Sequence, residues 1–232
     1  MLTKAEQVLS FGLPSVDQAF SGFRTGDFAV LYGHSFCKTL LFMLSVRCQL
    51  LKEQKGFVST AIYIDGGNTF NPYAISALAQ QHNLDPRSAL ERIFVSRAFT
   101  AYQLSTLIFK ALENALKHYK SKLILIADIT ALFLDPDVPA KEALNIFKKT
   151  VGYLSELATL RNVIVVASCF PHDCSKRRFA LESTLLRRAG SVIRIEETKG
   201  KILFKLETSP VFKPFAVDVL PSGVTLEQFL EA

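Results

Sequence analysis

The chain has 232 residues, of which 49% are hydrophobic and few are glycine or proline, so it can bury a large core in one domain or in a core with small extensions. Its apolar stretches, such as residues 123–127, are far too short to span a bilayer, and the N-terminus lacks the apolar centre of a signal peptide. We therefore expect a soluble cytoplasmic protein with no membrane partner. The net charge of +6 permits a polyanionic partner without requiring one.

Apolar runs rich in Ile, Val and Leu alternate with segments of helical spacing, a pattern typical of parallel strands joined by helical crossovers. A short helix over residues 13–17 and a glycine turn precede the first strand. The expected strands are 28–32, 61–65, 93–95, 123–127 and 163–168. The expected helices are 38–52, 72–82, 101–118, 139–160 and 182–189, the third beginning at the cap residue Thr100.

After residue 189 the pattern changes. Residues 191–196 and 201–208 flank Lys199-Gly200 and predict a β-hairpin, and residues 211–219 predict a further strand. The fold class expected is therefore α/β, with a mostly parallel central sheet flanked by helices and an antiparallel β extension at the C-terminal end.

The first strand leads into a segment that matches part of the phosphate loop G-x-x-x-x-G-K-[ST]. In that loop backbone N–H groups surround a phosphate, the lysine reaches the outer phosphates and the hydroxyl holds Mg²⁺. Counting back from Lys38 puts the first glycine of the pattern at Tyr32, so either the loop is one residue short or that glycine is missing. A charged residue and a hydroxyl at an ordinary helix start remain the alternative. The candidate nucleotide-binding residues are Gly33, His34, Ser35, Phe36, Cys37, Lys38 and Thr39.

Cys37 stands where the pattern has its second glycine. A side chain there tolerates positive φ poorly and crowds the space of the phosphate. The other cysteines, at 48, 169 and 174, show no paired framework, which agrees with a reducing compartment. Cys169-x-x-His172-x-Cys174 offers only part of a zinc site, and unligated thiols are the favoured interpretation.

Taken in order, these segments resemble the RecA/RadA recombinase superfamily, which includes KaiC-like ATPases. The resemblance covers nearly the whole chain and implies a RecA-like P-loop fold in a single domain over residues 1–232. Its parts would be a leading segment (1–27), an α/β core (28–190) and a β extension with a C-terminal tail (191–232). The segments that carry the resemblance are Phe11–Gly26, Ala61–Pro72, Arg92–Phe99, Leu123–Asp128, Val163–Ser168 and Leu186–Glu196.

Two catalytic positions depart from the family pattern. Gly67 occupies the place of the glutamate that activates the attacking water. Asp65 is the nearest carboxylate and a possible substitute base, although two residues along a strand place it about 7 Å back. The γ-phosphate sensor falls on Ser168 or Cys169, both of which are short.

The metal position is retained. The resemblance implies that Asp128 and Thr39 hold Mg²⁺, while a strand-end aspartate that caps a turn is the alternative for Asp128. With the loop altered, the base missing and the sensor shortened, we expect little or no ATP hydrolysis, and binding of ATP and Mg²⁺ is favoured over turnover.

The segment 169–190 carries five cations against two acids, a net charge of +3. The resemblance places it where recombinases contact single-stranded DNA, and Phe179 offers a ring on which a base could stack. Without the resemblance, a solvated charge run whose arginines pair with nearby acids would be favoured. The candidate DNA-binding residues are Lys176, Arg177, Arg178, Phe179, Arg187 and Arg188.

Three functions therefore stay open. The favoured one resembles the recombinase paralogues: an accessory protein of DNA recombination and repair that binds single-stranded DNA or a recombinase partner, with homo-oligomers possible. The second is an active ATPase that uses a non-standard base, and the third is a non-catalytic scaffold for protein contacts. Phe11, Phe20 and Phe23 could anchor a neighbouring subunit, although ordinary core packing is favoured for them.

Overall fold

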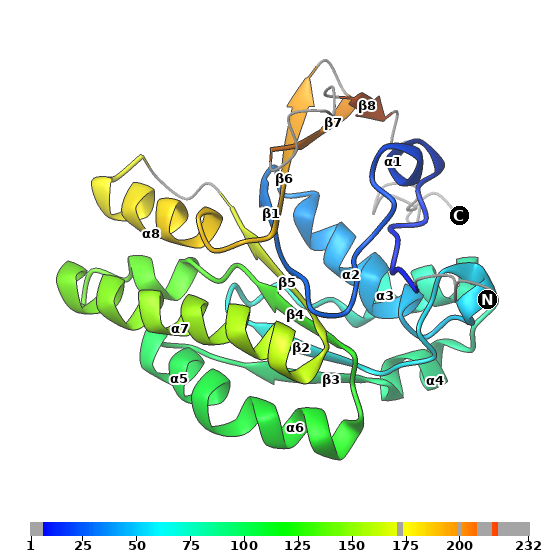
Figure 1. Ribbon diagram of the computed structural model, residues 1–232, viewed down its shortest axis with the longest axis horizontal. Helices are drawn as coiled ribbons and strands as arrows, with labels where there is room; N and C mark the ends of the chain where they lie inside the picture. The colour runs from blue at the N-terminus through cyan, green and yellow to red at the C-terminus, as the bar shows by residue number, and fades with distance from the viewer. Residues whose placement is uncertain (1–6, 171–173, 199–200, 208–214, 218–232) are drawn as a thin grey trace, which may run out of the picture.

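The computed structural model describes residues 7–170, 174–198, 201–207 and 215–217. Its centre is one eight-stranded sheet in the order β3-β2-β4-β5-β1-β6-β7-β8 (Figure 1). The strands from β3 to β6 pair in parallel, and β7 and β8 extend the sheet with antiparallel pairs. This arrangement confirms the α/β fold class and the antiparallel C-terminal extension. The strands are β1 (Phe28–Gly33), β2 (Ala61–Asp65), β3 (Ile93–Arg97), β4 (Leu123–Ala127), β5 (Ile164–Cys169), β6 (Ser191–Thr198), β7 (Lys201–Leu206) and β8 (Phe215–Val217).

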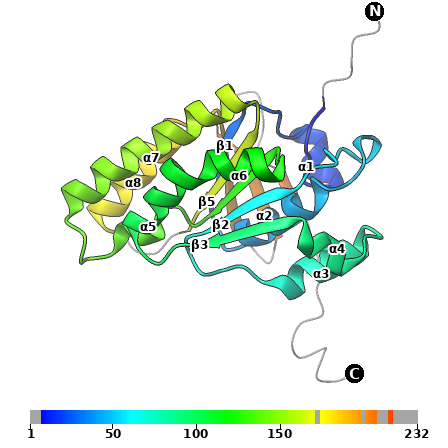
Figure 2. The same cartoon turned by 90° about the horizontal axis from the view of Figure 1, so that it is seen from below.

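Helices cover both faces of this sheet and bury two separate apolar clusters. Side chains of α1 to α4 pack into one cluster, and side chains of α5 to α8 into the other. Figures 1 and 2 show α5, α6 and α7 together along one face. The α-helices are α1 (Pro14–Ala19), α2 (Cys37–Arg47), α3 (Pro72–Gln81), α4 (Pro86–Glu91), α5 (Ala101–Thr106), α6 (Leu112–Tyr119), α7 (Ala140–Arg161) and α8 (Lys176–Leu186).

Side-chain caps explain where several helices begin. Thr100 accepts a hydrogen bond from the Gln103 N–H and starts α5, as its position in the sequence predicts. Asn71 and Asp85 cap α3 and α4 in the same way, each followed by a proline at the first helical position. Helix α4 was not predicted, although Asp85-Pro86 is the signal that could have found it.

Two predicted helices differ by several residues from the observed ones, which are Cys37–Arg47 and Lys176–Leu186. The helix expected over 38–52 ends at Arg47, whose guanidinium turns inward to the carbonyl oxygens of Ser10 and Gln54. The helix expected over 182–189 begins earlier, because Ser175 accepts a hydrogen bond from the Arg178 N–H and starts α8 at Lys176. The helix expected over 101–118 contains a π-helical segment, Leu107–Ala111, and short 3₁₀ turns occur at Lys52–Gln54 and Ala131–Leu134.

The phenylalanines of the leading segment belong to the core. Phe11 and Phe23 are fully buried, with ring centroids 5.3 Å apart in an edge-to-face contact, and Phe20 packs against both. They hold the N-terminal segment on the sheet, and the burial of Phe11 and Phe23 leaves neither ring available as a surface anchor. Across the described parts of the chain, every helix is too short or too polar to cross a membrane. The predicted turn Lys199-Gly200 and most of the strand expected over 211–219 lie outside the described residues.

Candidate nucleotide site and basic helix

Strands β1, β4 and β5 are parallel neighbours, so their carboxyl ends lie at one edge of the sheet. The switch point of the sheet lies between β1 and β5, because the connection after β1 runs into α2 on one face and the connection after β5 runs into α8 on the other. Ligands of open α/β sheets bind at such switch points. The loop after β1, Asp128 after β4 and Ser168 in β5 all lie at this edge.

Gly33 ends β1 at a positive φ of 106°, and only three residues separate it from Cys37 at the start of α2. A Cβ at this position would lie 2.3 Å from the carbonyl oxygen of Ile195 in β6. Gly33 is therefore required by the close approach of β6. With three residues between Gly33 and Cys37 instead of four, the geometry favours the short-loop alternative.

The backbone N–H groups of this loop are already bonded within the protein. His34 N donates to Ile195 O at 2.8 Å, and Phe36 N donates to the Nδ1 atom of His34 at 3.2 Å. Cys37 N and Lys38 N donate to the carbonyl oxygens of His34 and Ser35 at 3.1 and 3.0 Å. A phosphate loop needs such donors to point at the phosphate. Four of the five donors from His34 to Lys38 are engaged elsewhere.

Side chains of β6 and β7 hold the loop in this conformation. The Nε2 atom of His34 lies 2.9 Å from a carboxylate oxygen of Glu197. Phe36 packs edge-to-face against Phe204, with ring centroids 6.4 Å apart. A carboxylate beside the loop also opposes the approach of a phosphate.

Cys37 and Lys38 are also engaged by the fold. Cys37 is fully buried, and burial, with a smaller contribution from the nearby Asp128 carboxylate, raises the pKa of its thiol far above the usual range. The Lys38 ammonium lies 5.6 Å from the centre of the Phe170 ring, a cation–π contact across the sheet edge. The loop as folded therefore does not fit a triphosphate.

Asp128 lies between the loop and β5. It is 2% exposed and has a positive φ of 50°, a conformation that Asp adopts more readily than most residues. Its N–H donates to Ser168 Oγ at 3.1 Å, and its carboxylate accepts from Thr130 Oγ1 at 3.4 Å. The predicted sensor Ser168 thus holds the backbone of Asp128, and the turn at Asp128 carries the bonding expected of a strand-end aspartate.

Gly67, at the position of the family's glutamate, and Asp65, the predicted substitute base, lie in different surroundings. A Cβ at Gly67 would lie 2.8 Å from the Cβ of Asp128, so the backbone leaves no room for a glutamate there. Asp65 is fully buried and accepts hydrogen bonds from the N–H groups of Thr69 and Phe70. Arg97 lies 3.3 Å from the same carboxylate. Asp65 therefore orders the loop after β2, and its role as a substitute base stays a prediction.

The family model for Rad51 matches residues 5–170, more than half of the chain. The chain belongs to the Rad51 family. Its α/β sheet is accordingly the RecA-like core that the sequence resembles.

Two relatives of the Rad51 family show how far the likeness extends. The "DNA repair protein Rad51 homolog" of Drosophila melanogaster is 33% identical over 128 residues, which cover 54% of this chain and 38% of that protein. The "DNA repair protein RAD51 homolog" of Solanum lycopersicum is 32% identical over 114 residues, covering 48% of this chain and 33% of that protein. The matched part thus spans well under half the length of either relative.

Helix α8 lies beyond the part that matches the Rad51 family model, and its cations divide into two groups. Arg177 donates from Nε to the carbonyl oxygen of Phe133 at 2.7 Å. Arg178 forms an ion pair with Glu182 at 2.7 Å, with less than a fifth of either side chain exposed. Both arginines are bonded within the protein, which agrees with the alternative interpretation of this segment as a charge run whose arginines pair with nearby groups. The exposed cations of the predicted set are Lys176, Arg187 and Arg188.

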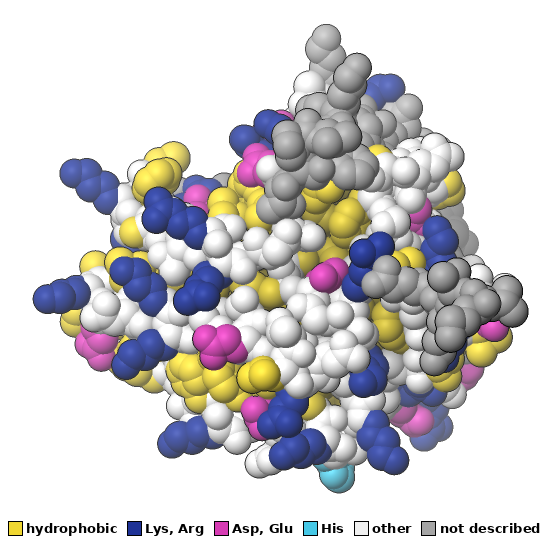
Figure 3. Space-filling view, viewed as in Figure 1, with side chains coloured by type: hydrophobic (Ala, Val, Ile, Leu, Met, Phe, Trp, Pro, Cys, Tyr) yellow, Lys and Arg dark blue, Asp and Glu magenta, His cyan; other side chains and the backbone are white. Residues whose placement is uncertain are grey.

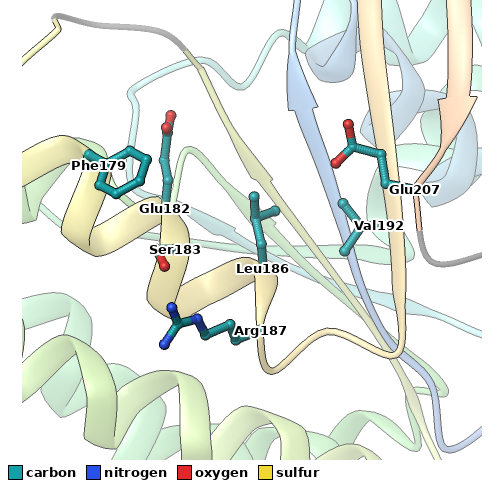
Figure 4. A pocket seen from close by; sticks show the side chains of 7 residues that line it. All are labelled: Phe179, Glu182, Ser183, Leu186, Arg187, Val192 and Glu207. Carbon is teal, nitrogen blue, oxygen red and sulfur yellow. The ribbon is translucent and has the colours of Figure 1, made fainter.

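Phe179 lines an open groove of about 400 Å³ between α8 and the strands β6 and β7 (Figure 4). Its ring is 74% exposed, but the groove also contains the carboxylates of Glu182 and Glu207. Arg187 also lines this groove, Glu182 is paired with Arg178, and Glu207 lies 3.8 Å from Arg194, so base stacking on Phe179 stays a prediction.

The thiols form no metal site in the part of the chain that the structure describes. Cys169 is buried and Cys174 exposed, while His172 lies outside the described residues. Burial also raises the pKa of Cys169 well above its usual value, so both thiols near the loop are protonated structural groups.

Proposed function

We propose that this Rad51-family chain is an accessory protein of DNA recombination and repair that binds nucleic acid, or a recombinase partner, without turning over ATP. The observation that carries the proposal is the conformation of the loop after β1. Four of its backbone N–H groups are bonded within the protein, and we call this conformation closed. Both relatives are DNA repair proteins by name, which supports a role in this pathway. On this proposal residues 1–232 act as one RecA-like unit.

ATP and Mg²⁺ are the ligands that the family implies, and Lys38, Thr39 and Asp128 are the residues that would hold them. The loop conformation does not fit the phosphates without breaking the bonds of His34 and the contacts of Phe36. Any nucleotide binding would therefore require the loop to move away from β6.

The active-ATPase alternative has less support from the geometry. Asp65 is occupied by two backbone donors and Arg97, and Gly67 cannot be replaced by glutamate on this backbone. The scaffold alternative differs from the proposal in predicting indifference to DNA.

The experiment is calorimetric titration of MgATP and of a non-hydrolysable analogue, with phosphate release assayed on the same protein. The proposal predicts no phosphate release above background and weak or no binding. Lys38→Ala serves as the control variant, because any affinity that involves the phosphates should fall when this cation is removed. Release at an ordinary ATPase rate would reject the proposal in favour of the active enzyme.

A further inference from the structure

The side of the molecule formed by α7 and α8 carries a concentration of exposed cations. In Figure 3 lysine and arginine side chains are spread over the region that these two helices occupy in Figure 1. Arg161 at the end of α7 pairs with Glu113, and Arg178 on the inner side of α8 pairs with Glu182. Among the described residues, the exposed cations of this region that form no ion pair with Asp or Glu are Lys141, Lys148, Lys149, Lys176, Arg187 and Arg188.

Four of these cations are brought together where the two helices meet. The guanidinium of Arg188 lies 3.9 Å from the position of a Cβ at Gly152 in α7. Lys148 and Lys149 precede Gly152 by four and three residues, so they lie on the same surface of α7, about one turn away. We call Lys148, Lys149, Arg187 and Arg188 the α7–α8 basic face.

The acidic side chains near this face do not cancel its charge. Glu156 is exposed one turn beyond Gly152, which leaves four cations against one carboxylate. Glu142 bonds to Tyr102 Oη at 2.8 Å, and Glu182 is paired with Arg178. The face therefore keeps an excess of positive charge on two rigid helices.

The face itself contains no aromatic side chain. Among the described residues, the exposed large apolar side chains of α7 and α8 are Leu160, which follows Gly152 by eight residues, and Phe179, which precedes Arg187 by eight and shares a groove with it. The attraction of exposed cations to phosphates does not depend on the base sequence. Such cations also do not require unstacked bases, as single-strand-specific surfaces do.

We propose that the α7–α8 basic face binds the phosphate backbone of nucleic acid, without sequence preference and with similar affinity for single and double strands. This inference rests on the proposed function and extends it, because Lys148 and Lys149 lie outside the segment in which DNA contacts were predicted. On this proposal nucleic acid is held by contacts to its phosphates, without base stacking on Phe179.

The test is a salt titration of binding to a fluorescently labelled single strand and to the matching duplex. The variants are Lys148→Ala/Lys149→Ala and, as a control of equal charge change on another face, Lys110→Ala/Lys117→Ala. Each lost phosphate contact reduces the slope of log K against log salt by about 0.9 for duplex and about 0.7 for single strands. The first variant should therefore bind duplex about 10- to 30-fold more weakly near 0.15 M salt, while the control keeps the wild-type slope.

The outcomes separate this inference from the proposed function. If the wild-type chain binds DNA and the Lys148→Ala/Lys149→Ala variant keeps its affinity and slope, the basic face is rejected and the proposed function stands. A strong preference for the single strand would also reject it. If the wild-type chain binds neither form, the nucleic-acid part of the proposed function fails as well. Melting curves that match wild type show that the exposed lysine substitutions leave the fold intact.

Discussion

At the scale of single residues, the same residue types have opposite roles at neighbouring positions. Arg177 and Arg178 adjoin Lys176 in the sequence, yet the two arginines bond to Phe133 and Glu182 while the lysine is exposed. The sequence predicts the cluster of charge but cannot distinguish these roles, because they depend on which face of α8 each residue occupies. That face is fixed by the Ser175 cap, a signal present in the sequence and missed.

Gly67 provides a direct test at this scale. Restoring the family's glutamate with Gly67→Glu places a side chain 2.8 Å from the Cβ of Asp128, so we expect destabilisation by about 1–3 kcal/mol and no gain of ATPase activity. Urea unfolding and phosphate release measure the two effects. A stable variant that hydrolyses ATP would show that only the base is missing.

Gly152 is the opposite case, because a methyl group there meets nothing closer than the tip of Arg188 at 3.9 Å. Glycine in the middle of α7 costs helix stability relative to alanine. We expect Gly152→Ala to raise the free energy of unfolding by about 0.5–1 kcal/mol and to leave DNA affinity unchanged. A loss of stability in thermal or urea unfolding would contradict the described packing of α8 on α7.

At the scale of elements, the sheet follows from the apolar runs, whereas the state of the phosphate loop does not. Strands β2 and β4 consist entirely of buried residues and were predicted within their observed bounds. The contacts between His34 and Glu197 and between Phe36 and Phe204 join residues more than 160 positions apart. Such pairs depend on β6 pairing beside β1, which local sequence patterns do not reveal.

Helix α8 and the residues that follow it give a matched pair of substitutions. Arg177→Ala leaves the Phe133 carbonyl without its donor, so we expect a loss of about 1–3 kcal/mol in unfolding free energy with little change in DNA affinity. Arg188→Ala removes an exposed charge of the α7–α8 basic face, two residues beyond α8, and should change stability by less than about 0.5 kcal/mol while weakening DNA binding.

Chemical unfolding and fluorescence anisotropy measure the two properties on the same samples. The reverse pattern, with Arg177→Ala stable but defective in DNA binding, would restore the role predicted for that arginine from the sequence. Circular dichroism confirms that each variant retains its helices.

At the scale of the whole molecule, a Rad51-family core combines a closed nucleotide loop with a basic surface on α7 and α8. The parallel sheet, the antiparallel extension and the family were all accessible from the order of motifs. The contacts that engage the loop could be found only in the structure, because β6 and β7, which make these contacts, come from the far end of the chain. We therefore expect the affinity for DNA to be the same in the presence and in the absence of nucleotide.

The most direct test of this central claim is the affinity for a labelled oligonucleotide, measured with and without MgATP while phosphate release is followed. We expect DNA binding whose affinity changes by less than about twofold on adding MgATP, since the loop does not open for a nucleotide, with no release above background. Binding that requires MgATP, or DNA-stimulated phosphate release over many turnovers, would contradict the account.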